Sequence, residues 1–188
     1  MLNKKLILFM FVIFCGFVLV FLIDAEQGRF FENPGISNNI SKINNSVSSE
    51  KSIPDNWVSV KPSSSMRFKE FLIKNSKGEF SLIVFKNMGG SADQNISRWI
   101  DQFSGPENPL LPFQKNEIEQ NGKNFIFLQN SGFFNGGMGQ SEAFSDAGLI
   151  AFIVDDKSDI YYFKAVSSVE ILIESKEEII STIFSSSI

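Results

Sequence analysis

The stretch GLIAFIVDDKSDIYYFKAV, residues 148–166, sets two apolar runs on either side of a short polar segment. Gly148 to Val154 and Ile160 to Val166 have the length and the β-branched and aromatic content of strands. The polar residues 155–159 between them fit a hairpin loop, which joins neighbouring antiparallel strands. The stretch therefore predicts a β-hairpin, and we expect the remaining elements to join or pack on the antiparallel sheet that contains it.

Further strand patterns lie upstream, at Trp57 to Val60, Met66 to Ile73, Glu79 to Lys86 and Glu117 to Phe127. A loop that contains a glycine, residues 75–78, joins the second of these segments to the third. Asn121-Gly122 lies at the centre of the fourth segment, and this dipeptide is a strong signal for a hairpin turn. The uninterrupted apolar run at 81–85 predicts a central strand that is covered on both faces.

Two amphipathic segments predict helices that pack on this sheet. The first begins with a capping box formed by Ser91 and Gln94 and ends at Gly105-Pro106. The second begins with a capping box at Ser175-x-x-Glu178, whereas residues 169–173 fit either a helix or a strand. The apolar stripes are Ile96, Trp99, Ile100 and Phe103 in the first helix, and Ile179, Ile180, Ile183 and Phe184 in the second. Hairpins with two helices predict an α+β fold, an antiparallel β-sheet with helices packed on it.

The composition of the 188-residue chain excludes several classes of site. Lys and Arg number 17 against 21 Asp and Glu, and this balance argues against nucleic-acid binding, which depends on basic patches. The chain has no histidine, so Ser-His and Cys-His catalytic pairs are absent. Its one cysteine, Cys15, rules out an intrachain disulfide and a cysteine-rich metal site. Residues 54–188 carry 12 basic and 17 acidic side chains, a net charge of −5.

The N-terminal segment has the pattern of a membrane anchor. Leu6 to Ile23 is an apolar run of 18 residues, which as a helix spans roughly 27 Å, enough to cross a hydrocarbon core. Lys4 and Lys5 precede the run, and acidic residues follow it, so the positive-inside rule places the N-terminus in the cytoplasm. The sequence therefore predicts a cytoplasmic end at 1–5 and a transmembrane helix at 6–23.

A flexible linker at 24–53 and a single extracytoplasmic domain at 54–188 are expected to follow this helix. Residues 32–53 are rich in Asn and Ser and contain no aromatic residue, which is typical of a tether. A cleaved signal peptide is the alternative for the N-terminus, with Ile23 and Ala25 at the −3 and −1 positions of the cleavage site. Lipidation of Cys15 fits poorly, because bulky residues precede it.

Three motifs are candidates for a functional site. Gly89-Gly90 ends a strand-like run ahead of the first helix, and such a turn either binds a phosphate or only connects strand to helix. The motif lacks the Gly-Lys-Ser/Thr ending of a phosphate loop, which favours the plain connection. The acids at 155–159 lack the spacing of an EF-hand and are typical of a polar hairpin tip.

The glycine-rich segment 131–139 is the strongest candidate, because it offers apolar side chains on an expected flexible loop. Phe133, Phe134 and Met138 are expected to grip a partner or to enter a bilayer surface. The alternative is that these aromatic residues fold back on the core. Arg98, on the first helix, is either solvated or turned toward a ligand. These four residues are the candidate partner-binding residues, and no catalytic, cofactor-binding or metal-binding residue is singled out.

The chain contains an ordered set of short motifs: Trp57, Pro62, Ser63, Met66-Arg67, Gly89-Gly90, Asn95, Arg98-Trp99 and Gln102, followed by Tyr161-Tyr162-Phe163-Lys164 and a closing amphipathic helix. This set resembles a family of exported bacterial envelope proteins of unassigned function. The family's pattern is a Ser-Pro-Met-Arg turn, then Gly-Gly, then Asn-x-x-Arg-Trp. Ser65 departs from it, since the family usually has proline there, and many members begin with a lipoprotein cysteine. The resemblance covers about residues 55–188 and implies a PsbP-like α/β sandwich but no reaction.

Together these features predict a single-pass protein of the bacterial inner membrane with its domain on the periplasmic side. The domain is expected to be a non-catalytic binding or scaffolding module without a cofactor, and its partner is an envelope protein or a small apolar ligand. An alternative is an envelope hydrolase that uses a pair of carboxylates, which would gather several acids in one cleft. A structural spacer in an envelope assembly, or a secreted protein with a cleaved signal peptide, also fits the sequence.

Overall fold

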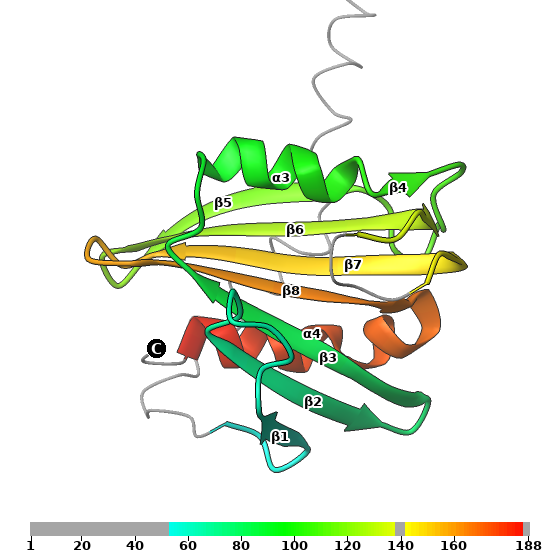
Figure 1. Ribbon diagram of the computed structural model, residues 1–188, viewed down its shortest axis with the longest axis horizontal. Helices are drawn as coiled ribbons and strands as arrows, with labels where there is room; N and C mark the ends of the chain where they lie inside the picture. Colours follow the sequence, from blue (N-terminus) through cyan, green and yellow to red (C-terminus); the bar gives the residue numbers. More distant parts are fainter. Residues whose placement is uncertain (1–52, 138–141, 186–188) are drawn as a thin grey trace, which may run out of the picture. The chain divides into compact units, whose positions relative to one another are not determined.

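The computed structural model describes residues 53–137 and 142–185, all within the compact unit Glu50–Ile188 (Figure 1). The expected cytoplasmic end, the transmembrane helix and the linker up to residue 52 lie outside the described residues. Among the residues that are described, no helix has both the length and the apolar character needed to cross a bilayer.

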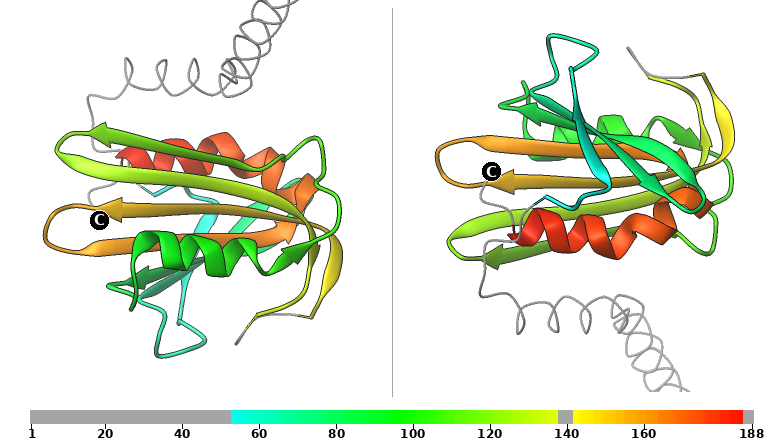
Figure 2. Two further views of the ribbon diagram at one scale, coloured as in Figure 1. Left: turned by 90° about the horizontal axis from the view of Figure 1, so that it is seen from above. Right: turned by 90° about the horizontal axis from the view of Figure 1, so that it is seen from below.

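Eight strands and two helices make up the described domain. The strands are β1 (Trp57–Val60), β2 (Lys69–Asn75), β3 (Gly78–Lys86), β4 (Phe103–Ser104), β5 (Gln114–Gln120), β6 (Lys123–Phe134), β7 (Phe144–Asp155) and β8 (Ile160–Ser168). The helices are α3 (Ala92–Ile100) and α4 (Val169–Ser185). The strands form one antiparallel sheet in the order β1-β2-β3-β8-β7-β6-β4, with β5 also paired to β6. Because α3 covers one face and α4 the other (Figure 2), the predicted α+β fold with an antiparallel sheet and two helices is confirmed.

The hairpins predicted from the sequence are present, but β2 begins at Lys69 and not at Met66, so residues 66–68 belong to the loop before it. The stretch 148–166 forms the β7–β8 hairpin, in which Ile153 lies opposite Tyr162. Asn121 and Gly122 take the positive φ angles, 53° and 73°, that a tight hairpin turn between β5 and β6 requires. Strand β3 is central, and Leu82 is buried on one face of it and Ile83 on the other, as expected.

The α4 face of the sheet is an aromatic core. The Phe152 ring lies 5.0 Å from that of Phe127 and 5.9 Å from that of Phe184, measured between ring centroids. Leu172 and Ile179 on α4 are fully buried against this core. Helix α4 therefore packs along its length, which explains why it forms although part of its sequence is polar.

The helix α4 begins at Val169, directly after β8, so the predicted capping role of Ser175 is wrong and the helical alternative for residues 169–173 is confirmed. The side chain of Ser175 is buried and accepts a hydrogen bond from Asn75 Nδ2 at 2.7 Å. The carboxylate of Glu178 accepts one from Trp57 Nε1, also at 2.7 Å. Both side chains of the expected capping box instead bind strands that are distant in the sequence.

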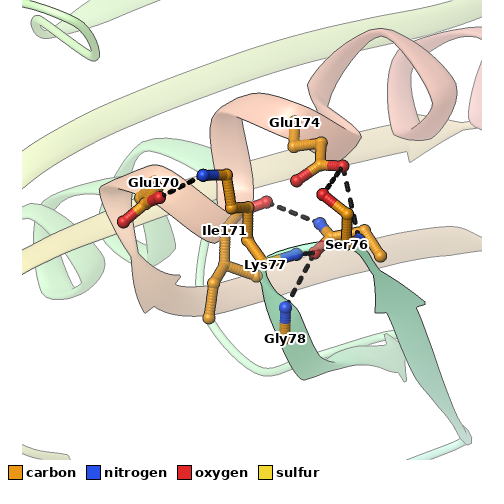
Figure 3. Close-up of polar contacts among 7 residues, drawn as sticks. Ser76, Lys77, Gly78, Glu170, Ile171 and Glu174 are labelled. Atoms are coloured by element: carbon orange, nitrogen blue, oxygen red, sulfur yellow. Dashed lines mark hydrogen bonds and ion pairs between the residues drawn. The ribbon is translucent and has the colours of Figure 1, made fainter.

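The turn between β2 and β3 is fastened to the first turns of α4 (Figure 3). Asn75 Nδ2 donates to the carbonyl oxygen of Ile171 at 2.9 Å, and Ser76 Oγ donates to Glu174 Oε1 at 2.7 Å. Gly78 has a φ angle of 156°, which residues with a side chain rarely adopt, and a Cβ atom there would also displace the end of the Ile171 side chain, so this position favours glycine. These contacts tie the β2–β3 hairpin to α4.

Helix α3 has the predicted start but an earlier end. Ser91 Oγ accepts from Gln94 N at 3.2 Å and Gln94 Oε1 accepts from Ser91 N at 2.9 Å, so the capping box is confirmed. The helix ends at Ile100 and not at Gly105-Pro106. Phe103 lies in β4, where pairing with β6 replaces helical hydrogen bonding, yet its side chain still packs on the same core as Trp99.

Candidate functional site

The edge of β6 has two different strand partners with a gap between them. Residues 123–129 of β6 pair with β5, whereas Phe133 and Phe134 pair with Ser104 and Phe103 of β4. Residues 130–132 pair with β7 alone. The chain that connects β4 to β5 leaves the sheet at this gap and returns to it at Gln114. The gap therefore opens the sheet edge beside the C-terminal end of α3.

A pocket of about 360 Å³ occupies this position, and we call it the sheet-edge pocket. Its lining residues are Ile100, Phe103, Ser104, Gly105, Glu107, Phe113, Asn130 and Ser131. Three of the side chains are large and apolar, and one lining residue is charged. Small-molecule sites have this composition, a mostly apolar wall with a few placed polar groups.

Asn130 gives the sheet-edge pocket a buried polar group. The residue is only 6% exposed, and it lies on the same face of the sheet as Leu128, beneath α3 and β4. Among the described residues its side-chain amide has no hydrogen-bond partner. A primary amide offers two donors and a carbonyl acceptor, and the Asn130 amide atoms are not among the fully buried unpaired polar atoms of the described residues, so they remain accessible from the pocket. The amide is therefore poised to bind a ligand group that both donates and accepts.

The walls of the pocket are held in place by side chains of the neighbouring sheet residues. Ser131 Oγ accepts from Asn108 N at 2.8 Å and donates to the carbonyl oxygen of Leu111 at 2.7 Å. Gln129 Nε2 donates to the carbonyl oxygen of Pro112 at 2.8 Å. These bonds fix the connection between β4 and β5, so the pocket is preformed by the fold.

Glu107 sets the charge of the pocket. Its carboxylate accepts a hydrogen bond from the backbone N–H of Phe113 at 2.9 Å, which fixes it at the rim. A negative rim repels an acidic ligand and tolerates a neutral or basic one. The pocket is therefore suited to a neutral apolar group that carries an amide or a similar donor–acceptor pair.

The structure separates the four residues that the sequence proposed for partner binding. Phe133 is 43% exposed at the end of β6, next to β4. Phe134 is fully buried between Phe103 and Phe144, so the expectation that its side chain is exposed in a loop is wrong. Strand β6 continues through it because β4 pairs there. Met138 lies outside the described residues.

Arg98, the fourth candidate, serves the glycine turn ahead of α3. Its guanidinium donates to the carbonyl oxygen of Gly89 at 3.1 Å and to the side-chain oxygen of Asn95. Asn95 Nδ2 in turn donates to the carbonyl oxygen of Ser91 at 2.9 Å. The turn is thus held together by its own side chains, and Asp93 adds a negative charge to the hollow beside it. This arrangement favours a plain connection between strand and helix over a phosphate site.

The acidic hairpin tip likewise makes a set of local bonds. Asp156 Oδ1 accepts from Asp159 N at 2.8 Å and from Ser158 N at 3.0 Å, and these bonds lower the pKa of Asp156. Asp159 forms an ion pair with Lys86 at 2.9 Å. Within residues 53–137 and 142–185, no three side chains of the metal-binding types lie close enough together to hold an ion.

Lys164 is the most perturbed titratable group of the described domain. It is 4% exposed on the α3 face, donates to Gln102 Oε1 at 2.6 Å and lies 5.9 Å from the centre of the Trp99 ring. Burial, and then the nearby charge of Arg67, lower the pKa of Lys164 to about 8. A lysine with a lowered pKa is a better nucleophile, but its deep burial favours a structural part in the α3 face.

Comparison of the chain with models of known protein families and with curated proteins gives no match. The assignment of the sheet-edge pocket as a candidate site therefore rests on its geometry. Sequence reasoning missed it because its lining residues come from four separate segments. A local signal exists in retrospect: Asn130 interrupts a long apolar strand at a position where an inward-facing residue is expected.

Proposed function

We propose that the chain is a membrane-tethered extracytoplasmic binding module that takes a small, neutral apolar group into the sheet-edge pocket. The observation that carries the proposal is the buried amide of Asn130 among Ile100, Phe103 and Phe113. The apolar walls supply affinity through burial, and the amide supplies orientation. Phe133, exposed near β4, extends the apolar surface at this end of the sheet.

The cellular setting of the proposal rests on the sequence. The apolar segment 6–23 with its preceding lysines supports a single inner-membrane helix, and the Asn- and Ser-rich residues up to 53 support a tether. The motifs shared with exported envelope proteins support a periplasmic domain with a PsbP-like sandwich, and a sheet between two helices is compatible with that architecture. Binding, and not bond-breaking, is the activity we assign to it.

A fluorinated fragment tests the pocket directly. We would incorporate the full-length chain into lipid nanodiscs and titrate 4-fluorobenzamide, which is neutral, apolar and able to donate and accept hydrogen bonds. Relaxation of the ¹⁹F signal reports binding, with empty nanodiscs as the reference. The Asn130→Leu variant is expected to weaken binding about threefold to tenfold, because a hydrogen-bonded amide pair is lost.

The control is Asn124→Leu, which removes an exposed amide from the same strand and is expected to leave binding unchanged. Phe113→Ser is expected to weaken binding as well, since it removes an apolar wall. Near-ultraviolet circular dichroism confirms that each variant is folded. Equal binding by the unmodified chain and by the Asn130 and Phe113 variants would refute the pocket as a ligand site.

A further inference from the structure

The loop between β1 and β2 presents apolar side chains to solvent. Met66 is 73% exposed and Phe68 is 44% exposed, although both belong to residue types that are usually buried. The loop extends away from the sheet on the side that carries α3 (Figure 2). It is separate from the sheet-edge pocket, whose lining comes from α3, β4, β6 and the connection between β4 and β5.

A buried carboxylate holds this loop in one conformation. Glu70 Oε2 accepts from Ser63 N at 3.1 Å, from Ser63 Oγ at 3.2 Å and from Arg67 Nη1 at 2.9 Å. Burial raises the pKa of Glu70, but these hydrogen bonds and the positive charge of Arg67 outweigh it and hold the pKa below its ordinary value. The backbone N–H of Arg67 also donates to the carbonyl oxygen of Ser64 at 3.1 Å. Met66 is therefore held outward by a fixed turn.

Two lysines lie beside the ring of Phe68. The ammonium groups of Lys69 and Lys86 lie 5.5 Å and 5.6 Å from the centre of the Phe68 ring. Lys61 is the first residue of the loop and is exposed, whereas Lys86 is partly neutralised by its ion pair with Asp159. Apolar side chains flanked by lysines match a lipid surface, where acyl chains lie beneath anionic headgroups.

We propose that the Met66 loop, residues 61–69, docks the folded domain on an anionic lipid bilayer. Met66 and Phe68 enter the interface, while Lys61 and Lys69 contact headgroup phosphates. This inference rests on the proposed tether, because the tether brings the folded domain near the membrane. Residues 24–52 span at most about 100 Å when extended, which keeps the domain close to the bilayer and raises its effective concentration there. Because the domain carries a net charge of −5, only a locally basic corner is attracted to anionic lipid, and this fixes one orientation.

The test measures how deeply the loop enters the bilayer. A nitroxide label is attached at Met66→Cys in the full-length chain, with Cys15→Ser to remove the native thiol. The chain is placed in nanodiscs of phosphatidylcholine with or without about one third phosphatidylglycerol, and electron paramagnetic resonance compares accessibility to oxygen and to a water-soluble nickel complex. In the anionic discs the label is expected to be more accessible to oxygen than to nickel. This preference for oxygen is expected to fall in the Lys61→Gln, Lys69→Gln variant.

Leu110→Cys is the matched control, because Leu110 is 72% exposed and belongs to the connection between β4 and β5. Its label is expected to remain accessible to nickel in both lipids. Equal accessibility at positions 66 and 110 would overturn the docking proposal. Immobilisation of the label at position 66 without a gain in oxygen accessibility would assign the loop to a protein contact and would also overturn it.

Co-elution of the chain with nanodiscs separates docking from the tether. Co-elution with both lipids and with the lysine variant supports the tether, and the depth measurement then decides the docking. Co-elution only with anionic discs, lost in the lysine variant, supports docking and refutes the tether. Failure to co-elute with either lipid refutes both.

Discussion

The two faces of the sheet are built in different ways. The α4 face is closed by a helix of 17 residues, by phenylalanine rings in tilted and edge-to-face contact and by the polar contacts of the β2–β3 turn (Figure 3). The α3 face has a helix of 9 residues, which leaves the sheet-edge pocket at one end and the Met66 loop beside it. The α3 face has its own buried cluster around Trp99 and Tyr162, but we expect the α4 face to contribute more to stability, whereas the surfaces suited to contact lie on the side of α3.

The two faces of the sheet also differ in their buried ionisable groups. Glu70 and Lys164 are buried on the α3 face, in one row across the sheet with Ile83 between them. The corresponding rows on the α4 face contain aromatic and aliphatic residues such as Phe71, Leu82 and Phe163. Burying an ionisable group costs more than burying an apolar one. On the α3 face, Glu70 and Lys164 therefore serve to hold loops in position and not to stabilise the core.

The largest expected effect comes from breaking the α4 face. Replacing Phe152 by alanine removes a ring that packs against Phe127 and Phe184, and we expect it to lower the free energy of unfolding by about 3–5 kcal/mol. Phe133→Ala is the control on β6, where the ring is largely exposed, with an expected loss below about 1 kcal/mol. Urea unfolding of the full-length chain measures both. Similar losses for the two variants would contradict the assignment of stability to the α4 face.

The second effect is a pH dependence on the α3 face. Because Lys164 has a pKa of about 8 when folded against an ordinary value of 10.5, the folded chain holds fewer protons between these pH values. Its burial therefore costs most below pH 8, and the cost falls as pH rises toward 10.5. The free energy of unfolding, relative to a Lys164→Met variant, is expected to rise by about 2–3 kcal/mol from pH 7 to pH 10.

Urea unfolding at pH 7, 8.5 and 10 checks this rise. At each pH the free energy of unfolding of the Lys164→Met variant is subtracted from that of the unmodified chain. Lys176→Met is the second control, because Lys176 lies on α4 and burial lowers its pKa to a smaller extent. A difference between the unmodified chain and the Lys164 variant that stays constant with pH would show that the amine is not desolvated. It would also remove the contrast in buried charge between the faces.

Local patterns were sufficient to predict the elements whose signals are short-range. Asn121-Gly122 specifies its hairpin through backbone angles that few other residues adopt, and the Ser91–Gln94 capping box is complete within one turn. The capping box predicted at Ser175 and Glu178 does not form, because these side chains bind Asn75 and Trp57, 100 and 121 residues away in the sequence. Tertiary contacts overrode a local motif there.

The candidate site was harder to predict because it depends on which strands share an edge. Nothing near Asn130 shows that β5 begins opposite Gln129 and that β4 begins opposite Phe134. The same pairing buries Phe134 beneath Phe103, so that only Phe133 of the two adjacent aromatic residues is exposed. The sequence located the right end of β6 but not the side chains that face outward or line the pocket.

The smallest expected effect tests whether the faces unfold separately. Ser91→Ala removes the N-cap of α3 and is expected to cost about 1 kcal/mol, because the backbone N–H of Gln94 loses its acceptor. Ser97→Ala, at an exposed position within α3, is the control and should be neutral or slightly stabilising, since alanine favours helices. Hydrogen exchange followed by mass spectrometry should show faster exchange in α3 for Ser91→Ala and unchanged exchange in α4. Equal loss of protection in both helices would mean that the two faces form one cooperative unit, and the α3 face would then be as firmly fixed as the core it covers.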